Sequence, residues 1–270
     1  MELRLNIPTS TAQLSPRQLK AISWLFLMGL PETEFLVKAF LFLSGLKLFT
    51  SNPVRPGHSG GQQPATPSDQ VIRAGSNYFT HKSLKKPFII DADLLSEMAK
   101  QCSFLLTPGE VKPIRWIRFA RARHFRLYNA SFEEYLMAEN YYFAYTETKK
   151  PEHLDNLIAV LYRKPWHRWN SAKIQKRGLQ FSRLKPEVKN TVFMWYTGFR
   201  AYVPKRCPHL FSGGGKKAAF NPRNYTNGMV HQLSGGDITI KSKLLQQPCW
   251  DALDELEQRA IEADSLTSNK

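Results

Sequence analysis

Apolar and polar residues recur with helical spacing most clearly in residues 131–163, which predicts two consecutive helices. In the first helix, apolar side chains return every three or four residues, as one buried helix face requires. Ser131 and Glu134 have the spacing of a capping box, in which the serine hydroxyl and the glutamate carboxylate each accept a hydrogen bond from the other residue's amide. Pro151 suits the first turn of the second helix, which is apolar nearly all round. This helical hairpin is therefore expected in the core.

The N-terminal region predicts a second pair of apolar helices. Ser15 and Pro16 form a cap followed by a first-turn proline, and the helix that they begin is expected to end near Gly29. Pro31 begins the next helix, so the two form another helical hairpin. A DNA-binding helix-turn-helix has a similar connection, but its second helix presents polar side chains to the bases. Because residues 37–49 are largely apolar, core packing is favoured here.

The other segments have weaker patterns. Residues 51–70 are rich in Pro, Gly, Ser and Gln, which predicts a flexible linker or exposed loop. Residues 77–90 contain two short apolar stretches around a lysine-rich turn, which predicts a small antiparallel β-hairpin. Residues 114–128 alternate imperfectly between apolar and arginine residues, so they suit a long strand, which is favoured, or a basic amphipathic helix. Pro186 is expected to begin a further helix, and residues 248–263 to form a last, amphipathic one.

These elements predict a mainly α fold, with a helical bundle-like body and a small antiparallel β-hairpin. The expected organisation is an N-terminal helical hairpin in residues 1–50, the linker in residues 51–70, and a mainly helical body in residues 71–270 that ends with the amphipathic helix. The sequence contains no internal repeat.

The composition is that of a globular protein with a strong positive charge. The chain has 270 residues, of which 42% are hydrophobic, and a formal net charge of +16, which favours a polyanionic or acidic partner. Cys102, Cys207 and Cys249 are odd in number and widely spaced, unlike a disulfide framework, so a reducing cytoplasm is expected. The uncharged runs at 21–31 and 39–46 are shorter than the roughly 20 residues of a membrane-spanning helix, so no membrane insertion is expected.

The positive charge is concentrated in one segment. Residues 163–223 contain 15 Lys and Arg residues against one Glu, whereas residues 131–162 contain two basic and six acidic residues. Lysine and arginine neutralise phosphates, and exposed aromatic rings stack on unpaired bases. An acidic protein partner, or the acidic helices of this chain, would satisfy the same charge. The candidate residues for binding a partner or nucleic acid are Arg115, Arg118, Arg121, Arg123, Arg126, Trp166, Arg168, Trp169, Lys173, Lys176, Arg177, Arg183 and Lys185.

No catalytic group, metal site or cofactor site is predicted. The glycine-rich residues 212–217 lack the spacing of a P-loop, and Ala218 stands where a P-loop has its metal-binding hydroxyl. Cys207 and His209 are two possible metal ligands, but no second pair follows at a usable spacing. The glutamates of the 131–163 hairpin lack the Glu-x-x-His partners of a di-metal helical bundle. We therefore expect a protein that is not an enzyme.

Three segments in the second half of the chain form a recognisable combination. They are LDNLIAVLYR at residues 154–163, FMWYTGFR at 193–200 followed by PHLF at 208–211, and WDALDELE at 250–257. This combination resembles tail-assembly or structural accessory proteins of bacterial prophages and phage-tail-like gene clusters. The resemblance implies a role in assembly and transfers no catalytic residue.

The favoured hypothesis is a non-enzymatic, cytoplasmic assembly or chaperone-like factor of this phage-tail-like type that binds a protein partner. Its contact surfaces would be the last helix and the basic residues 163–223. The alternative is a nucleic-acid-binding protein that uses the basic, aromatic-rich residues 115–126 and 163–223. In both cases the acidic residues of 131–162 are expected to bind part of the basic segment, which reduces the surface left for a polyanion.

Overall fold

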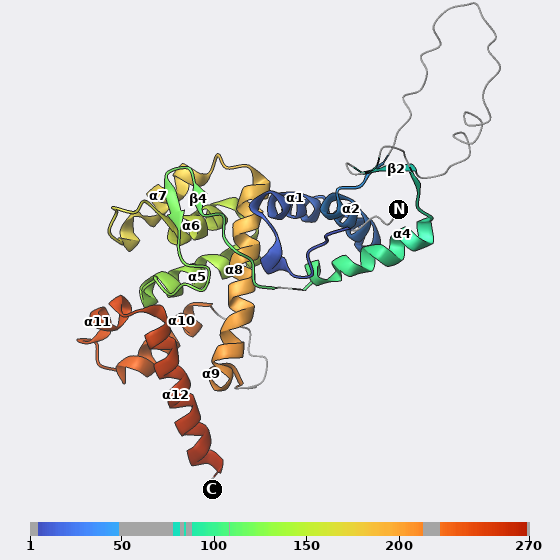
Figure 1. Ribbon diagram of the computed structural model, residues 1–270. Coiled ribbons are helices and arrows are strands. Elements are labelled where there is room, and N and C mark those ends of the chain that lie inside the picture. Colours follow the sequence, from blue (N-terminus) through green and yellow to red (C-terminus); the bar gives the residue numbers. More distant parts are fainter. Residues whose placement is uncertain are drawn as a thin grey trace, which may run out of the picture. The chain divides into compact units, whose positions relative to one another are not determined.

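The computed structural model describes residues 5–48, 78–81, 84, 88–107, 109–212 and 222–268. The chain divides into two compact units, residues 1–107 and residues 108–270. Figure 1 colours the first from blue to green and the second from green to red. The linker predicted at 51–70 lies outside the described residues.

The first unit contains the predicted pair of N-terminal helices, α1 (Pro16–Leu27) and α2 (Glu32–Ser44), after a 3₁₀ turn, η1 (Thr11–Gln13). Ser15 caps α1: its hydroxyl accepts from the Gln18 amide at 3.3 Å, and the Gln18 side chain accepts from the Ser15 amide at 2.9 Å. Helix α1 packs against α2. The apolar residues that the pair buries include Leu19, Ile22, Phe35, Leu36, Ala39 and Phe40.

Three short strands form an antiparallel sheet in the first unit: β1 (Lys47–Leu48), β2 (Tyr78–Thr80) and β3 (Phe88–Ile89), in the order β1-β2-β3. Strands β2 and β3 are the β-hairpin that the sequence predicts near 77–90. Strand β1 was not predicted, and it pairs with β2. Gly45 ends α2 with a φ of 75°, a left-handed conformation that glycine adopts without strain, and so leads the chain into β1.

The same unit includes the helix after this hairpin, α4 (Ala92–Ala99), and the 3₁₀ helix η2 (Lys100–Leu105). The Asp91 side chain accepts a hydrogen bond from the first amide of α4 at 3.0 Å. The sequence assigns residues 71–270 to one body, whereas the structure places residues 78–107 in the unit of the N-terminal helices. The reason is that β1 pairs with β2 and that α4 and η2 pack on α2.

The second unit is mainly helical, in agreement with the predicted fold class. Its helices are α5 (Phe132–Thr148), α6 (Pro151–Leu161), α7 (Ile174–Phe181), α8 (Pro186–Arg206), α9 (Pro208–Ser212), α10 (Pro222–Ser234), α11 (Lys241–Gln246) and α12 (Cys249–Ser268), and a 3₁₀ turn, η3 (Ser171–Lys173), precedes α7. Helix α6 contacts α5, α7 and α8, and α12 contacts α5 (Figure 1). Helix α8 begins at the predicted Pro186, and α12 continues past the predicted end at residue 263.

The helical hairpin of residues 131–163 lies in the core of the second unit. Ser131 and Glu134 form the predicted capping box: the Glu134 amide donates to the serine hydroxyl at 3.3 Å, and the Ser131 amide donates to the carboxylate at 3.0 Å. Pro151 occupies the first turn of α6. Burial extends around most of α6, and its buried residues are Leu154, Asp155, Leu157, Ile158, Ala159, Val160 and Leu161.

Residues 114–128 form two short strands rather than the long strand or the helix expected from the sequence. Strands β4 (Trp116–Ile117) and β5 (Ala120–Ala122) pair antiparallel, and β6 (Tyr162–Arg163), which directly follows α6, pairs with β5. The chain reverses at Arg118, whose φ of 54° lies in the left-handed region. Because the residues after this turn run in the opposite direction, the alternating pattern does not continue as one long strand.

Helix α8 lies very close to the first residues of the second unit at Gly198. A Cβ atom at this position would lie 2.0 Å from the carbonyl oxygen of Gly109, a backbone atom that cannot rotate away. The Gly198→Ala variant is therefore expected to lose about 1–3 kcal/mol of its free energy of unfolding, measured by urea denaturation of the full chain. Gly228→Ala in α10 is the matched control, because a Cβ there meets nothing within 4 Å. Equal stability of the two variants would contradict the close approach.

Candidate polyanion-binding groove

Buried carboxylates of α5 and α6 are paired with basic side chains of the same unit, as the charge distribution predicts. The pairs are Glu134 with Arg123 and Arg163, Glu139 with Arg200, and Asp155 with Lys189. Because these three carboxylates are buried, the pairs belong to the fold, and removing one partner would leave an uncompensated charge. The Trp169 indole also donates to a Glu133 carboxylate oxygen at 2.6 Å. Part of the positive charge is thus neutralised inside the unit.

Arg126, a predicted site residue, is held inside the unit. Its guanidinium donates to both carboxylate oxygens of Glu110, at 2.8 and 3.0 Å, and lies 4.3 Å from the centre of the Tyr202 ring. Its backbone carbonyl accepts from the Trp250 indole at 2.6 Å. Arg126 and Arg123 therefore bind carboxylates of their own unit and stabilise the fold, and their role in binding a partner or nucleic acid stays a prediction.

Arg177 holds the end of α6 and also lines the candidate site. Its guanidinium donates to the carbonyls of Ala159 and Tyr162, at 2.5 and 2.8 Å, where the last turn of the helix leaves carbonyls without intrahelical partners. Burial, followed by the nearby guanidinium of Arg163, lowers the pKa of Arg177, although Glu134 acts in the opposite direction. Arg177 is therefore a partly buried cation with other charged side chains of the unit nearby.

Helix α7, the loop of residues 164–170 and the β4–β5 hairpin enclose two adjoining hollows, which we call the basic groove. The first has a volume of about 290 Å³ and the second of about 460 Å³, and both are lined by His167, Arg177 and Gln180. The described residues that line them include no Asp or Glu. The basic lining residues are Arg118, Lys164, His167, Arg168, Lys173, Lys176 and Arg177.

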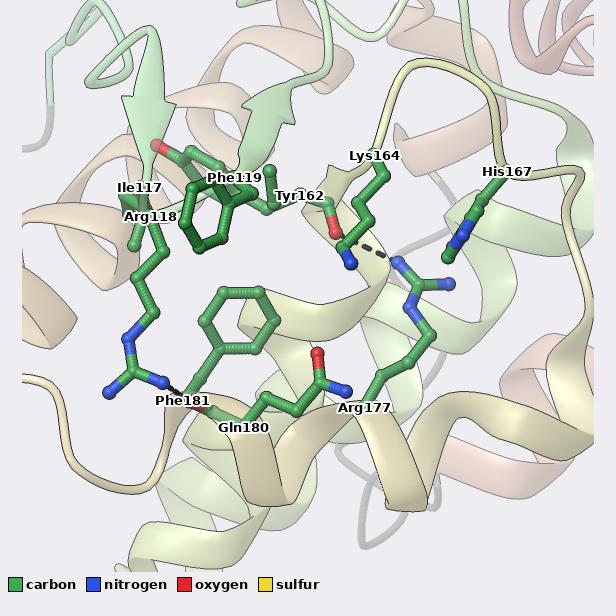
Figure 2. A pocket seen from close by; sticks show the side chains of 10 residues that line it. Ile117, Arg118, Phe119, Tyr162, Lys164, His167, Arg177, Gln180 and Phe181 are labelled. Atoms are coloured by element: carbon green, nitrogen blue, oxygen red, sulfur yellow. Dashed lines mark hydrogen bonds between the residues drawn. The ribbon is translucent and has the colours of Figure 1, made fainter.

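Aromatic rings and cations line the first hollow together, and Arg118 lies on the same side as the two phenylalanine rings (Figure 2). Phe119 and Phe181 lie on one side of it, and Lys164 and Arg177 lie on the other. The Arg118 guanidinium donates to a backbone carbonyl of α7 and so joins the hairpin to this helix. The groove is therefore built by segments that are distant in sequence and are tied together by hydrogen bonds.

Two aromatic rings of the groove are exposed to solvent. The Trp166 side chain, in the 164–170 loop, is 72% exposed, and the Phe119 side chain, at the turn of the hairpin, is 75% exposed. Trp169 differs, because its indole is bound to Glu133. Exposed rings beside cations provide flat faces on which a base can stack, next to charges that neutralise phosphates.

The structure gathers most of the predicted site residues on one surface. Those that line the basic groove are Arg118, Trp166, Arg168, Trp169, Lys173, Lys176 and Arg177. Arg121 lines a third, neighbouring hollow. The predicted residues that are exposed but lie outside the lining of these hollows are Arg115, Arg183 and Lys185. Phe119, Lys164 and His167 lie within the predicted segments 115–126 and 163–223, but they were not among the individual candidate residues.

The described residues that line the groove supply hydrogen-bond donors and positive charge, and none of them is a cysteine. The cysteines are free and buried elsewhere, and burial raises the pKa of Cys102 and of Cys207 to about 11, so these thiols are protonated and weakly nucleophilic at neutral pH. Across the residues that the structure describes, no cluster of three His, Cys, Asp or Glu side chains is arranged to hold a metal ion. Of the helices in those same ranges, none has the length and hydropathy to cross a membrane.

Helix α12 uses its apolar side within the second unit. Trp250, Leu253 and Leu256 are buried, and the helix contacts α5, α9 and α10. Glu257 accepts hydrogen bonds from two amides of α9, at 3.0 and 2.7 Å. The apolar stripe of the last helix is therefore covered within the unit, and only the exposed side of the helix is left for a partner.

Comparison of the chain with family models, with curated proteins and with solved structures yields no match. The choice between candidate functions therefore depends on the residues of the basic groove and on the exposed surfaces of the two units.

Proposed function

We propose that this protein binds single-stranded nucleic acid without catalysing a reaction, and that the basic groove holds the strand. The observation that carries this proposal is that Trp166 and Phe119 are exposed at a groove with many basic lining residues. Among the described residues that line this groove, none has a carboxylate. Each nucleotide of a single strand combines one phosphate charge with one unpaired base. Cations and exposed rings side by side match both features.

An unpaired strand suits the groove better than a duplex or an acidic peptide. In a duplex the base faces are stacked on each other, so Trp166 and Phe119 would have no partner. An acidic peptide would satisfy the cations of α7, but its carboxylate side chains have no flat apolar face for these rings. The proposal therefore assigns the charge to the phosphates and the exposed rings to the bases.

The Trp166→Ala variant is expected to bind a labelled single-stranded oligonucleotide about 5–150-fold more weakly than the wild type, because one stacked base contributes about 1–3 kcal/mol. Fluorescence anisotropy at constant salt measures the affinity. Trp24→Ala is the matched control, since Trp24 is 54% exposed and belongs to the first unit. The contradicting result has two parts: a polyglutamate peptide of equal charge binds as tightly as the oligonucleotide, and Trp166→Ala changes neither affinity. That result would favour an acidic protein partner instead.

An assembly or chaperone-like factor that binds a protein partner is the second candidate function. One observation favours it: Trp24, Leu27 and Met28, at the end of α1, are all exposed. Large apolar side chains grouped on a surface often mark a protein-binding site. The Trp24→Ala variant separates the two candidates, because it is expected to leave strand binding unchanged and to weaken binding of a protein partner.

A further inference from the structure

The third hollow, beside the basic groove, is lined by cations from two paired strands. It has a volume of about 230 Å³ and lies at β5, β6 and the start of the 164–170 loop. Of the described residues that line it, none is a carboxylate. Its charged and amide-bearing residues are Arg121, Arg123, Arg163, Lys164 and Asn129.

Strand pairing holds two of these arginines together. Arg121 of β5 is the register partner of Arg163 of β6. Side chains at directly opposed positions lie on the same face of the sheet, with Cβ atoms about 5 Å apart, and like charges there repel. An anion bound by both guanidinium groups would relieve this repulsion.

Among the residues that the structure describes, one carboxylate pairs with this cluster. The buried Glu134 accepts from Arg163 at 3.1 Å and also from Arg123. The Nε atom of Arg123 is buried and has no hydrogen-bond partner among the described residues. Burial, followed by the neighbouring Arg123 guanidinium, lowers the pKa of Arg163. One glutamate is therefore shared by two arginines, and one positive charge of the pair remains uncompensated.

Arg121 and Lys164 add two further charges on the outer side of the cluster. Arg121 is exposed and Lys164 is half-buried. Within the described ranges, neither side chain forms an ion pair or a hydrogen bond. Both charges are available to a ligand.

We infer that this third hollow binds a dianionic phosphate group, which occurs as the phosphomonoester at the end of a nucleic-acid strand and as free inorganic phosphate. A phosphomonoester carries about two negative charges at neutral pH and three acceptor oxygens. It matches the charges of Arg121 and Lys164, whereas an internal phosphodiester or a carboxylate carries a single charge. Arginine forks bind phosphate oxygens in pairs, which adds directional fit.

The assignment to a strand end rests on the proposed function, whereas binding of free phosphate does not. Lys164 lines both the third hollow and the first hollow of the basic groove. A strand lying in the groove therefore brings its terminal phosphate to the third hollow directly.

The test compares oligonucleotides of one sequence that carry a 5′-phosphate, a 3′-phosphate or only hydroxyl ends, by fluorescence anisotropy with the full chain. One phosphorylated form is expected to bind about 10-fold more tightly than the hydroxyl form, as a charge-assisted contact provides. Arg121→Ala is expected to remove this difference while leaving binding of the hydroxyl form. Lys173→Ala, in the basic groove, is the control, and it is expected to weaken all forms equally. A parallel thermal-shift titration uses inorganic phosphate as the probe.

The outcomes separate this inference from the proposed function. If all three oligonucleotides bind equally, the terminal-phosphate site is overturned and the groove proposal stands. If no oligonucleotide binds but inorganic phosphate stabilises the wild type and not Arg121→Ala, the phosphate site stands and nucleic-acid binding fails. If neither the oligonucleotides nor phosphate bind, both are overturned. Arg121 is exposed, so circular dichroism of Arg121→Ala should match the wild type and confirm that its fold is intact.

Discussion

The Glu134→Ala variant is expected to lose about 3–5 kcal/mol of its free energy of unfolding, because it leaves buried cations without their counter-charge. Glu134 pairs with both Arg123 and Arg163, and its side chain is 3% exposed. It also accepts from the Ser131 amide at the start of α5, so the change removes half of a capping box as well. One substitution therefore acts on the strands, on the helix terminus and on the charge balance of the third hollow. Urea denaturation followed by circular dichroism measures the loss.

Two further variants identify which of these contributions dominates. Glu147→Ala, on the exposed last turn of α5, is the control and is expected to change the free energy of unfolding by less than about 0.5 kcal/mol. Glu134→Gln retains an acceptor for the Ser131 amide but removes the charge, so it is expected to be almost as unstable as Glu134→Ala. If Glu134→Ala unfolds at the same urea concentration as Glu147→Ala, the shared ion pair does not hold the unit together.

Charge reversal in the basic groove is expected to lower the affinity for a single-stranded oligonucleotide by about 100-fold or more, since charge-assisted phosphate contacts each contribute about 1.5–3 kcal/mol. The variant replaces Arg168, Lys173 and Lys176, which line the second hollow and are exposed, with glutamate. None of these three side chains forms an ion pair within the described ranges, so the fold is expected to tolerate the change.

The matched control reverses three charges elsewhere in the second unit. Lys205 of α8 and Lys241 and Lys243 of α11 are exposed and do not line the groove. Reversing them changes the net charge by the same amount, and we expect it to change the affinity by only a few-fold through long-range attraction. Equal losses in both triple variants would show that net charge, and not the groove, binds the strand.

The helices were predictable because their boundaries depend on local chemistry. Ser15 with Pro16 and Ser131 with Glu134 act within one turn of backbone, so their sequence spacing specifies where α1 and α5 begin. Pro151 works in the same way at α6. In each case the residues that determine the structure are neighbours in sequence, and no tertiary information is needed.

The strands and the division of the chain depend on contacts between distant residues. Strand β1 forms only because β2, which lies beyond the predicted linker, pairs with it. At the turn, Arg118 adopts the left-handed conformation that glycine adopts most easily, and without a glycine the sequence carries no signal for this turn. The alternating pattern of residues 114–128 therefore predicted the strands at Trp116–Ile117 and Ala120–Ala122, but neither the reversal between them nor the turns that follow.

The candidate site was predictable as a region but not residue by residue. The basic, aromatic-rich run contains the groove, yet charge alone does not show which arginines are already paired. Arg123 and Arg126 resemble Arg121 in sequence, but their partners Glu134 and Glu110 are brought to them by the fold. Lys164 joins the site because β6 lies beside β5. Selecting free cations requires the tertiary structure.

The salt dependence of oligonucleotide binding tests the central claim most directly. Anisotropy titrations of the wild type between low and physiological salt are expected to give a linear plot of log affinity against log salt, with a slope of about −2 to −4 for three to six phosphate contacts on a single strand. In the triple variant of Arg168, Lys173 and Lys176, the magnitude of this slope is expected to fall by about 2. A salt-independent affinity, or the same slope in the wild type and the triple variant, would contradict strand binding in the basic groove.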